Sequence, residues 1–367
     1  MRLIPPRDEF AGSVVVEAVH ACGGALLCQA GTTLTASLLR RLREHGVDAV
    51  AIEAEAYEGI DARECLDRDA RWAMHQLFGR AAEQVAAGHA PTGLPLRPVQ
   101  GVRAHVLEAV DRDPLPCLLW PRRALRLESG AEICAPAELD WQDTRDMVEA
   151  LVVQALNTAI IVAAATRSLH LGPARREPLV DAALIHDLGM VTVPVRVWLR
   201  QGALGVEERV LMRNHPLASL EAFEGNERWD TFARLAVRQH HERLNGTGYP
   251  QGLGGQRVPI SSLLLGAADV YAARIEPRPY RQGLPAEDLA AAVLAMGGAE
   301  FPPQVVRAVV ESVGLYPRGG VLELSDGRRS VVVRPGRGLR ERPVVRVAGE
   351  DLDLGHHPEI AVRGLVG

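Results

Sequence analysis

Residues 240–250 read HHERLNGTGYP, and this stretch joins a helix to a loop. His240 and His241 end a segment that begins at Trp229 and carries apolar residues at helical spacing. The residues that follow include Asn, two Gly and Pro, which are typical of a turn or loop. The pattern predicts two adjacent histidines at the end of a helix, with a loop directly after them.

Helical spacing of apolar residues continues on both sides of this stretch. The first predicted helix starts near Trp141 and keeps a buried face from Met147 to Val162. The other segments predicted to be helical are Leu179–Leu188, Val206–His215, Trp229–His241, Ser261–Arg274, Leu284–Met296 and Pro303–Val313. Seven helical segments with short loops are typical of an all-α bundle, which we place at residues 141–315.

Four histidines and two aspartates fall on these predicted helices. His186 and Asp187 end an apolar helix, where an ionised carboxylate is costly to bury unless it is paired or bound to a metal. His215 opens a turn with Pro216, and Asp269 places another carboxylate on an apolar helix. A lone His is more often a hydrogen-bonded core residue than a ligand. Six such residues in one bundle instead predict a site for Fe, Mn or Zn.

Residues 1–56 read as a small α+β module before the bundle. Val14–Ala18 and Ala25–Cys28 predict a hairpin, Thr33 caps a helix, and Val47–Ile52 returns as a strand. A structural or dimerising module is the simpler interpretation, and a sensory role is the functional alternative.

Residues 57–140 are predicted to connect this module to the bundle. Residues 59–90 show the apolar periodicity of a helix, and the Gly- and Pro-rich stretch 89–101 is the best linker candidate. Prolines between residues 114 and 136 limit any long helix beyond it, which predicts short helices and loops.

The tail, residues 316–367, changes to the period of strands. Val321–Leu324, Ser330–Val333 and Val344–Val347 predict short strands, and Asp326-Gly327 predicts a hairpin turn between the first two. The fold class is therefore mainly α, with an N-terminal α+β module and a C-terminal antiparallel β appendage.

The composition is that of a soluble globular protein. The 367 residues are 47% apolar and 24% charged, with a formal net charge of −5, which does not favour binding to a nucleic-acid polymer or an anionic membrane. The N-terminus does not read as a signal peptide. The apolar run Ala150–Ala165 is interrupted by Gln154, Asn157 and Thr158, so we expect no membrane span and a cytoplasmic protein.

The five cysteines are scattered and form no CxxC pair, so neither a zinc knuckle nor a disulfide framework is indicated. We interpret them as small buried apolar residues. They are Cys22, Cys28, Cys65, Cys117 and Cys134.

The order and spacing of these motifs resemble the HD-GYP family over about residues 145–315. The shared motifs are HD at 186–187, HP at 215–216, HHE..NG.GYP at 240–250, AAD at 267–269 and PRPYR at 277–281. The GYP segment meets eight family positions in eleven residues and is highly specific. The flanking modules also look like those that accompany this domain in some members.

The resemblance implies a metal-dependent phosphodiesterase that hydrolyses cyclic di-GMP to pGpG or GMP. Its cofactors would be two divalent transition-metal ions, Fe or Mn, which activate a water and neutralise the phosphate. Asp187 would bridge the ions and act as the catalytic residue. The implied metal ligands are His186, Asp187, His215, His240, His241 and Asp269.

The resemblance also implies sites for substrate and partners. Arg278 and Arg281 would clamp phosphates, although two solvated loop arginines are the simpler interpretation. The loop would serve substrate access and contacts with GGDEF-domain proteins. The implied loop residues are Glu242, Asn245, Gly246, Gly248, Tyr249 and Pro250.

Three positions depart from the family pattern. Gln154 stands where the family has a metal-binding His, Met190 replaces the Lys of HDxGK, and Ala272 replaces the Asp of ADxYDA. A Glu found in trimetal members would fall at Ala150, and Glu149 is expected to point to a different side. Gln is a poor ligand for Fe, Mn or Zn, and Met supplies no charge.

These departures leave two functions open. The first is a cyclic di-GMP phosphodiesterase with weakened activity. The second is a catalytically inactive HD-GYP domain that senses cyclic di-GMP or binds a protein. A phosphohydrolase for another nucleotide is less favoured because the GYP segment is complete. Oligomeric state is open, and a homodimer through the N-terminal region is one expectation.

Overall fold

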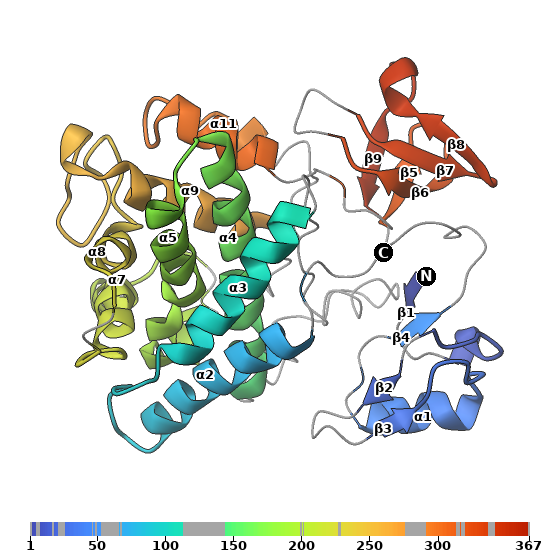
Figure 1. The fold of residues 1–367 in the computed structure, drawn as a ribbon, viewed down its shortest axis with the longest axis horizontal. Helices are drawn as coiled ribbons and strands as arrows, with labels where there is room; N and C mark the ends of the chain where they lie inside the picture. Colours follow the sequence, from blue (N-terminus) through green and yellow to red (C-terminus); the bar gives the residue numbers. More distant parts are fainter. Residues whose placement is uncertain are drawn as a thin grey trace.

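The structure is a computed structural model. It confirms the predicted mainly α fold (Figure 1). Its described residues are 2–4, 8–16, 18–20, 26–45, 47, 50–52, 66, 68–112, 144–198, 200, 202–226, 229–275, 291–312, 316, 320–336 and 342–365. Within these ranges the helices from α2 (Arg68–Ala86) onward form one body, and the strands lie in two smaller parts, one from each end of the chain, the first of which also contains helix α1 (Ala36–Glu44) (Figure 1). Each of the three parts has its own apolar core.

Helix α4 (Thr144–Ser168) is the centre of the helical body (Figure 1). It packs against α5 (Pro173–Ile185), α9 (Ile260–Ile275) and α11 (Pro303–Ser312). Residues 151–166 of α4 are all buried, because neighbouring helices cover every face of this segment. This central position puts Gln154, which lies on α4, inside the bundle.

By length and composition, α4 could cross a membrane. Its window Met147–Ser168 has a mean hydropathy of 1.8, so the three polar residues that interrupt the apolar run do not by themselves exclude a span, contrary to the argument from sequence. The structure buries 89% of that window inside the protein. The apolar surface of α4 is thus used for packing, as in the core helix of a soluble protein.

Two helices before α4 belong to the same apolar core. Helix α2 (Arg68–Ala86) confirms the predicted helical stretch and packs on α4. Helix α3 (Arg97–Arg112) packs on α4 and α5, and it begins inside the stretch expected to be a linker. Pro98 is compatible with the helix because the first turn has no intrahelical partner for its missing N–H. Residues 113–143 lie outside the described residues, and the domain boundary at 140 stays a prediction.

Three further helices follow α5 in the chain, namely α6 (Val195–Trp198), α7 (Val206–Glu221) and α8 (Thr231–Gln239). Helix α8 packs on α5 and α7, and α6 packs on α7. A 3-10 turn, η5 (Leu188–Thr192), joins α5 to α6 and packs on α7. Helix α7 continues through Pro216, so the predicted end of this helix at His215 is wrong. Of the predicted helix Leu284–Met296, the described part is helical over 291–294.

The N-terminal part holds two small antiparallel pairs around one helix. Strand β1 (Arg2–Ile4) pairs with β4 (Val50–Ile52), and β2 (Val19–His20) pairs with β3 (Leu26–Cys28). Helix α1 (Ala36–Glu44) is capped by Thr35, whose side chain accepts the Leu38 N–H; the predicted cap, Thr33, is wrong. A short 3-10 turn, η1 (Asp8–Phe10), precedes β2.

Cys28 is a free, buried cysteine of this N-terminal part, as expected. Burial raises the pKa of its thiol, which keeps it in the neutral form. The other four cysteines lie outside the described residues.

The C-terminal part is a five-stranded antiparallel sheet in the order β8-β7-β6-β5-β9. The three predicted strands are β5 (Val321–Leu324), β6 (Arg329–Arg334) and β7 (Val344–Val347). Asp326 and Gly327 form the predicted hairpin turn, with Gly327 at a φ of +85°. Two further strands, β8 (Glu350–Asp353) and β9 (Val362–Leu365), were not predicted. The sequence EDLD of β8 has little of the β-branched character that marks a strand.

Candidate metal centre

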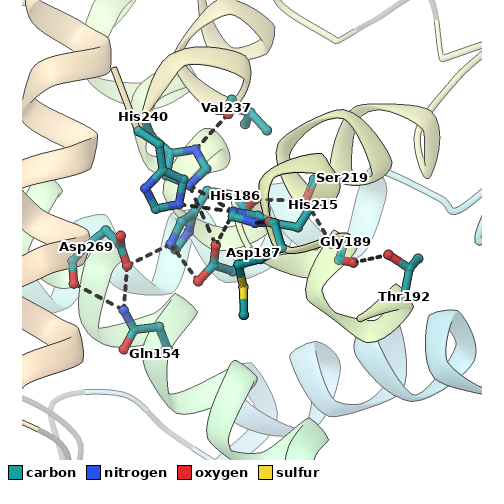
Figure 2. A network of polar contacts seen from close by, with 12 residues as sticks. Gln154, His186, Asp187, Gly189, Thr192, His215, Ser219, Val237, His240 and Asp269 are labelled. Carbon is teal, nitrogen blue, oxygen red and sulfur yellow. Dashed lines mark hydrogen bonds and ion pairs between the residues drawn. The ribbon is translucent and has the colours of Figure 1, made fainter. Parts of the chain in front are cut away.

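All six predicted ligands meet at one place in the helical body. Figure 2 shows His186, Asp187, His215, His240 and Asp269 converging there from α5, α7, α8 and α9. Their ligand atoms fall into two groups. In each group these atoms lie within 4.8 Å of one another. The four-donor group is Asp187, His215, His240 and His241, and the three-donor group is His186, His240 and Asp269.

The close approach of η5 and α7 positions the HD pair next to His215. Gly189 makes this approach possible, because a Cβ there would lie 2.2 Å from the His215 carbonyl oxygen. The Gly189 N–H donates to Ser219 Oγ at 2.7 Å, and that hydroxyl donates to the His186 carbonyl at 2.8 Å (Figure 2). Ser219 thus ties α7 to the end of α5 and holds the ligands in register.

The rings of three histidines are oriented in the same way. In each, Nδ1 lies 2.7–2.8 Å from the backbone carbonyl three residues earlier, at Ala183, Met212 and Val237. A carbonyl oxygen can only accept, so Nδ1 carries the proton and Nε2 faces the centre. Fixing the tautomer through the outer nitrogen is how proteins prepare histidine to bind a metal. The three histidines are His186, His215 and His240.

Pro216 explains one of these contacts. In a regular helix the N–H of residue 216 would donate to the carbonyl of Met212, and proline has no N–H. The His215 ring takes that carbonyl instead, at 2.7 Å. The HP pair therefore orients the ligand and lets α7 continue at the same time.

The Nε2 atoms of three histidines face one another in the centre. Nε2 of His215 lies 3.4 Å from Nε2 of His240 and 3.2 Å from Nε2 of His241. The ring protons of His215 and His240 are on Nδ1, so no proton is left for a hydrogen bond between their facing lone pairs. Imidazole nitrogen with carboxylate oxygen is a donor set for first-row transition metals. The residues present fit a divalent metal ion.

Asp187 lies between the two groups. Its Oδ1 is 3.2 Å from Nε2 of His215, and its Oδ2 is 3.4 Å from Nε2 of His186. Burial opposes ionisation of Asp187, but the charge of His186 and the contacts with His215 and His240 outweigh it and hold the pKa of Asp187 well below its ordinary value. Asp187 is therefore an anion with one oxygen facing each donor group.

The histidines differ in protonation. Burial lowers the pKa of His186, but Asp187 and the contact with Asp269 outweigh this effect and raise it to about 9. Burial lowers the pKa of His240 despite its contact with Asp187. Burial and the neighbouring His240 lower the pKa of His241 well below its ordinary value. The lowered pKa values favour the neutral imidazole at His240 and His241 of the four-donor group.

Gln154 lies at the centre, as the family pattern implied for the missing His (Figure 2). Its Nε2 donates to Asp269 Oδ1 at 2.6 Å and to the Asp269 carbonyl at 3.2 Å. Its Oε1 is buried and has no hydrogen-bond partner among the described residues. Gln154 therefore acts in this arrangement as a donor to a ligand and not as a ligand.

The other departures are apolar side chains in the core. Met190 is 7% exposed and follows Asp187 by one 3-10 turn, and Ala272 is fully buried. Glu149 forms ion pairs with Arg71 and His75 of α2, which confirms that it points to a different side. The described part of the centre thus gains no carboxylate from Glu149 and no cation from Met190.

The GYP loop is attached to the centre by Glu242. This buried carboxylate accepts the N–H of Gln251 at 2.7 Å and that of Leu253 at 2.8 Å. Gly248 lies against α8, because a Cβ there would lie 2.3 Å from the His241 carbonyl oxygen. The Tyr249 ring stacks on the His241 ring with centroids 4.4 Å apart. The loop therefore covers one side of the four-donor group.

The outer part of the loop is exposed. Asn245 Oδ1 accepts the Thr247 N–H at 3.1 Å and its hydroxyl at 2.7 Å, which closes the turn that contains Gly246 at a φ of +74°. Asn245, Thr247 and Pro250 are exposed to solvent.

Sequence reasoning missed one cation beside this loop. The guanidinium carbon of Arg213 lies 5.4 Å from the centroid of the Tyr249 ring, and Arg213 is exposed. Its position two residues before His215 is a signal that could have been noticed. Arg278 and Arg281, the predicted phosphate clamps, lie outside the described residues.

Comparison with known proteins gives the class. Residues 144–305 match the HD domain family. The chain is 32% identical over 241 residues to the cyclic di-GMP phosphodiesterase PA4108 of Pseudomonas aeruginosa, covering 64% of this chain and 54% of that protein. It is 34% identical over 130 residues to the cyclic di-GMP phosphodiesterase response regulator RpfG of Xanthomonas campestris, covering 35% and 34%. It is 37% identical over 144 residues to a cyclic di-GMP phosphodiesterase of Vibrio cholerae, covering 38% and 29%.

The bundle is therefore an HD domain. Its GYP loop and its similarity to these relatives agree with the resemblance to the HD-GYP family. The matches span about half of one relative and about a third of the other two.

Proposed function

We propose that this protein is a metal-dependent phosphodiesterase that hydrolyses cyclic di-GMP to pGpG or GMP. The observation that carries the proposal is the convergence of the six imidazole and carboxylate side chains, with Asp187 between the two donor groups. The names of the three relatives agree with this substrate. Gln154 and Met190 should make the activity weaker than that of a domain with His and Lys at these positions.

Two divalent ions, Fe or Mn, are the proposed cofactors, held by His186, Asp187, His215, His240, His241 and Asp269. When bound, such ions supply positive charge against a phosphate and lower the pKa of a water. Asp187 contributes one oxygen to each donor group, which is the role of a bridging carboxylate and the reason we assign it as the catalytic residue.

Residues around the centre would bind and orient the substrate. Tyr249 stacks on His241 and places an aromatic ring beside the centre. The exposed guanidinium of Arg213, whose carbon lies 5.4 Å from the centroid of that ring, offers a cation to a phosphate of the substrate. Arg278 and Arg281 remain proposed clamps for phosphate.

The surroundings of the domain support further assignments. The exposed residues of the GYP loop offer a surface for a GGDEF-domain protein. Burial of α4 in the bundle supports a cytoplasmic protein without a membrane span. The N-terminal part, which has a core of its own, is the proposed site of a homodimer contact.

A second candidate function is an inactive HD-GYP domain that senses cyclic di-GMP or binds a protein. Two observations favour it. The Gln154 amide donates a hydrogen bond to the Asp269 carboxylate, and Met190 provides no cation beside Asp187. Such a domain would keep the loop and the substrate surface and lose turnover.

One experiment separates the two functions. The purified protein is incubated with cyclic di-GMP and Mn²⁺ or Fe²⁺, the products are resolved by chromatography, and binding is measured by calorimetry in parallel. We expect slow formation of pGpG that stops on chelation. Binding without any product would support the sensor, and neither binding nor product would reject both functions.

A further inference from the structure

The two donor groups of the centre are unequal. The four-donor group brings three imidazoles and one oxygen of Asp187 together. The three-donor group shares His240 with it, so its own side chains are His186 and Asp269, with the other oxygen of Asp187 3.4 Å from His186 Nε2. An ion in the second group would therefore have fewer protein donors than an ion in the first.

Gln154 weakens the second group further. The nitrogen of a side-chain amide is a hydrogen-bond donor and offers no lone pair to a metal. Gln154 Nε2 donates a hydrogen bond to Asp269 Oδ1 at 2.6 Å, and the same oxygen lies 3.4 Å from His186 Nε2. An ion that binds there has to share this oxygen with the amide.

Without a bound cation, exchanging the positions of the Gln154 amide oxygen and nitrogen is also unfavourable. A turned Gln154 would bring Oε1 toward the Asp269 carboxylate, and two oxygens without a proton repel each other. In the present orientation Oε1 is buried without a partner among the described residues, and the residue is 3% exposed. Leaving a buried amide oxygen without a hydrogen bond is unfavourable. The hydrogen bond from Gln154 Nε2 to Asp269 therefore fixes the amide in this orientation.

We propose that the centre binds one divalent ion tightly in the four-donor group and a second one at least ten-fold more weakly in the three-donor group, and that Gln154 sets the difference. The inference rests on the metal centre of the proposed function. It adds the order in which the two ions bind and the residue responsible. Gln154 is thus a positioning residue that holds Asp269. Changes to residues that support a metal ligand alter metal affinity by about 10–100-fold, which is the size expected here.

The test is a titration of the chelator-stripped full-length protein with Mn²⁺, with free Mn²⁺ followed by electron paramagnetic resonance. We expect one tight ion and one weak ion per chain. In Gln154→His the weak site should gain at least about ten-fold in affinity, because an imidazole replaces the amide. Gln100→His adds a histidine to α3, outside both donor groups, and should leave the titration unchanged.

Asp269→Asn in the wild-type background gives an independent readout if Gln154→His does not fold. It should remove the weak ion and retain the tight one. Two ions of equal affinity in the wild-type protein would overturn the inference and leave the proposed metal centre standing. An unchanged weak site in folded Gln154→His would also overturn it. No bound ion in the wild-type protein would instead refute the metal centre itself.

Discussion

Glu149→Gln should destabilise the helical body through the ion pair between α4 and α2. Glu149 contacts Arg71, which is 4% exposed, and also His75. Burial raises the pKa of Glu149, but the hydrogen bond from His75 and the charge of Arg71 outweigh it and lower the value from 4.5 to about 2. At 1.36 kcal/mol per pKa unit, this shift corresponds to about 3 kcal/mol of stability at pH 7.

The direction of this pKa shift determines how the stabilisation by Glu149 changes with pH. A carboxyl with a pKa lowered by folding stabilises the folded state above its unfolded value of 4.5, and loses that contribution as the pH falls toward 2. The difference between the wild-type protein and Glu149→Gln should therefore shrink from about 3 kcal/mol at pH 7 to about 1 kcal/mol at pH 3. Urea unfolding followed by circular dichroism at both pH values measures it.

Glu108→Gln is the matched control. Glu108 forms an i,i+4 ion pair with Arg112 on α3, and both side chains are more than two thirds exposed. Exposed pairs of this kind contribute less than about 1 kcal/mol. Equal effects of the two substitutions, or an effect of Glu149→Gln that does not change between pH 7 and pH 3, would refute the reasoning.

Three further predictions concern activity and stability. Gln154→His combined with Met190→Lys should raise the rate of cyclic di-GMP hydrolysis at least about ten-fold, because the pair restores a ligand and a cation; an unchanged rate would count against the placement of these residues. Arg213→Ala should raise KM several-fold with little change in kcat, whereas Arg209→Ala on the same helix should change neither, and equal effects would contradict a phosphate contact. The pKa of Asp181 is raised from 3.8 to about 6, chiefly by burial and against the charge of Arg103. Because folding raises this pKa, protonated Asp181 stabilises the folded state, and this stabilisation should be lost as the pH rises from about 4 through 6. In Asp181→Asn, the free energy of unfolding measured over the same pH range should not show this loss.

The side chains that meet at the centre could be predicted from sequence because their motifs are short and local. His186-Asp187, His215-Pro216 and His240-His241 each place their donors at a helix end or turn, and the structure brings them together. The contact of Gln154 with Asp269 could not be predicted, since it joins residues 115 positions apart and depends on how α4 meets α9.

The errors in the fold come from reading prolines as helix breakers. Pro98 lies in the first turn of α3, where its missing N–H has no cost, and Pro216 lies in α7, where the His215 ring uses the free carbonyl. Propensity also failed for β8, whose acidic residues form a strand because β7 lies beside it. For Pro216 and β8, a side-chain or tertiary contact outweighs the local preference.

The most direct test of the account is the metal content of the protein. The full-length chain is loaded with Mn²⁺, passed through a desalting column, and measured by inductively coupled plasma mass spectrometry beside Asp187→Asn and the exposed-histidine control His89→Ala. We predict at least one retained ion per chain in the wild-type protein and in His89→Ala, and a clear loss in Asp187→Asn. Retention that is equal in all three proteins, or absent from the wild-type protein, would contradict the claim that the six converging side chains form a metal centre.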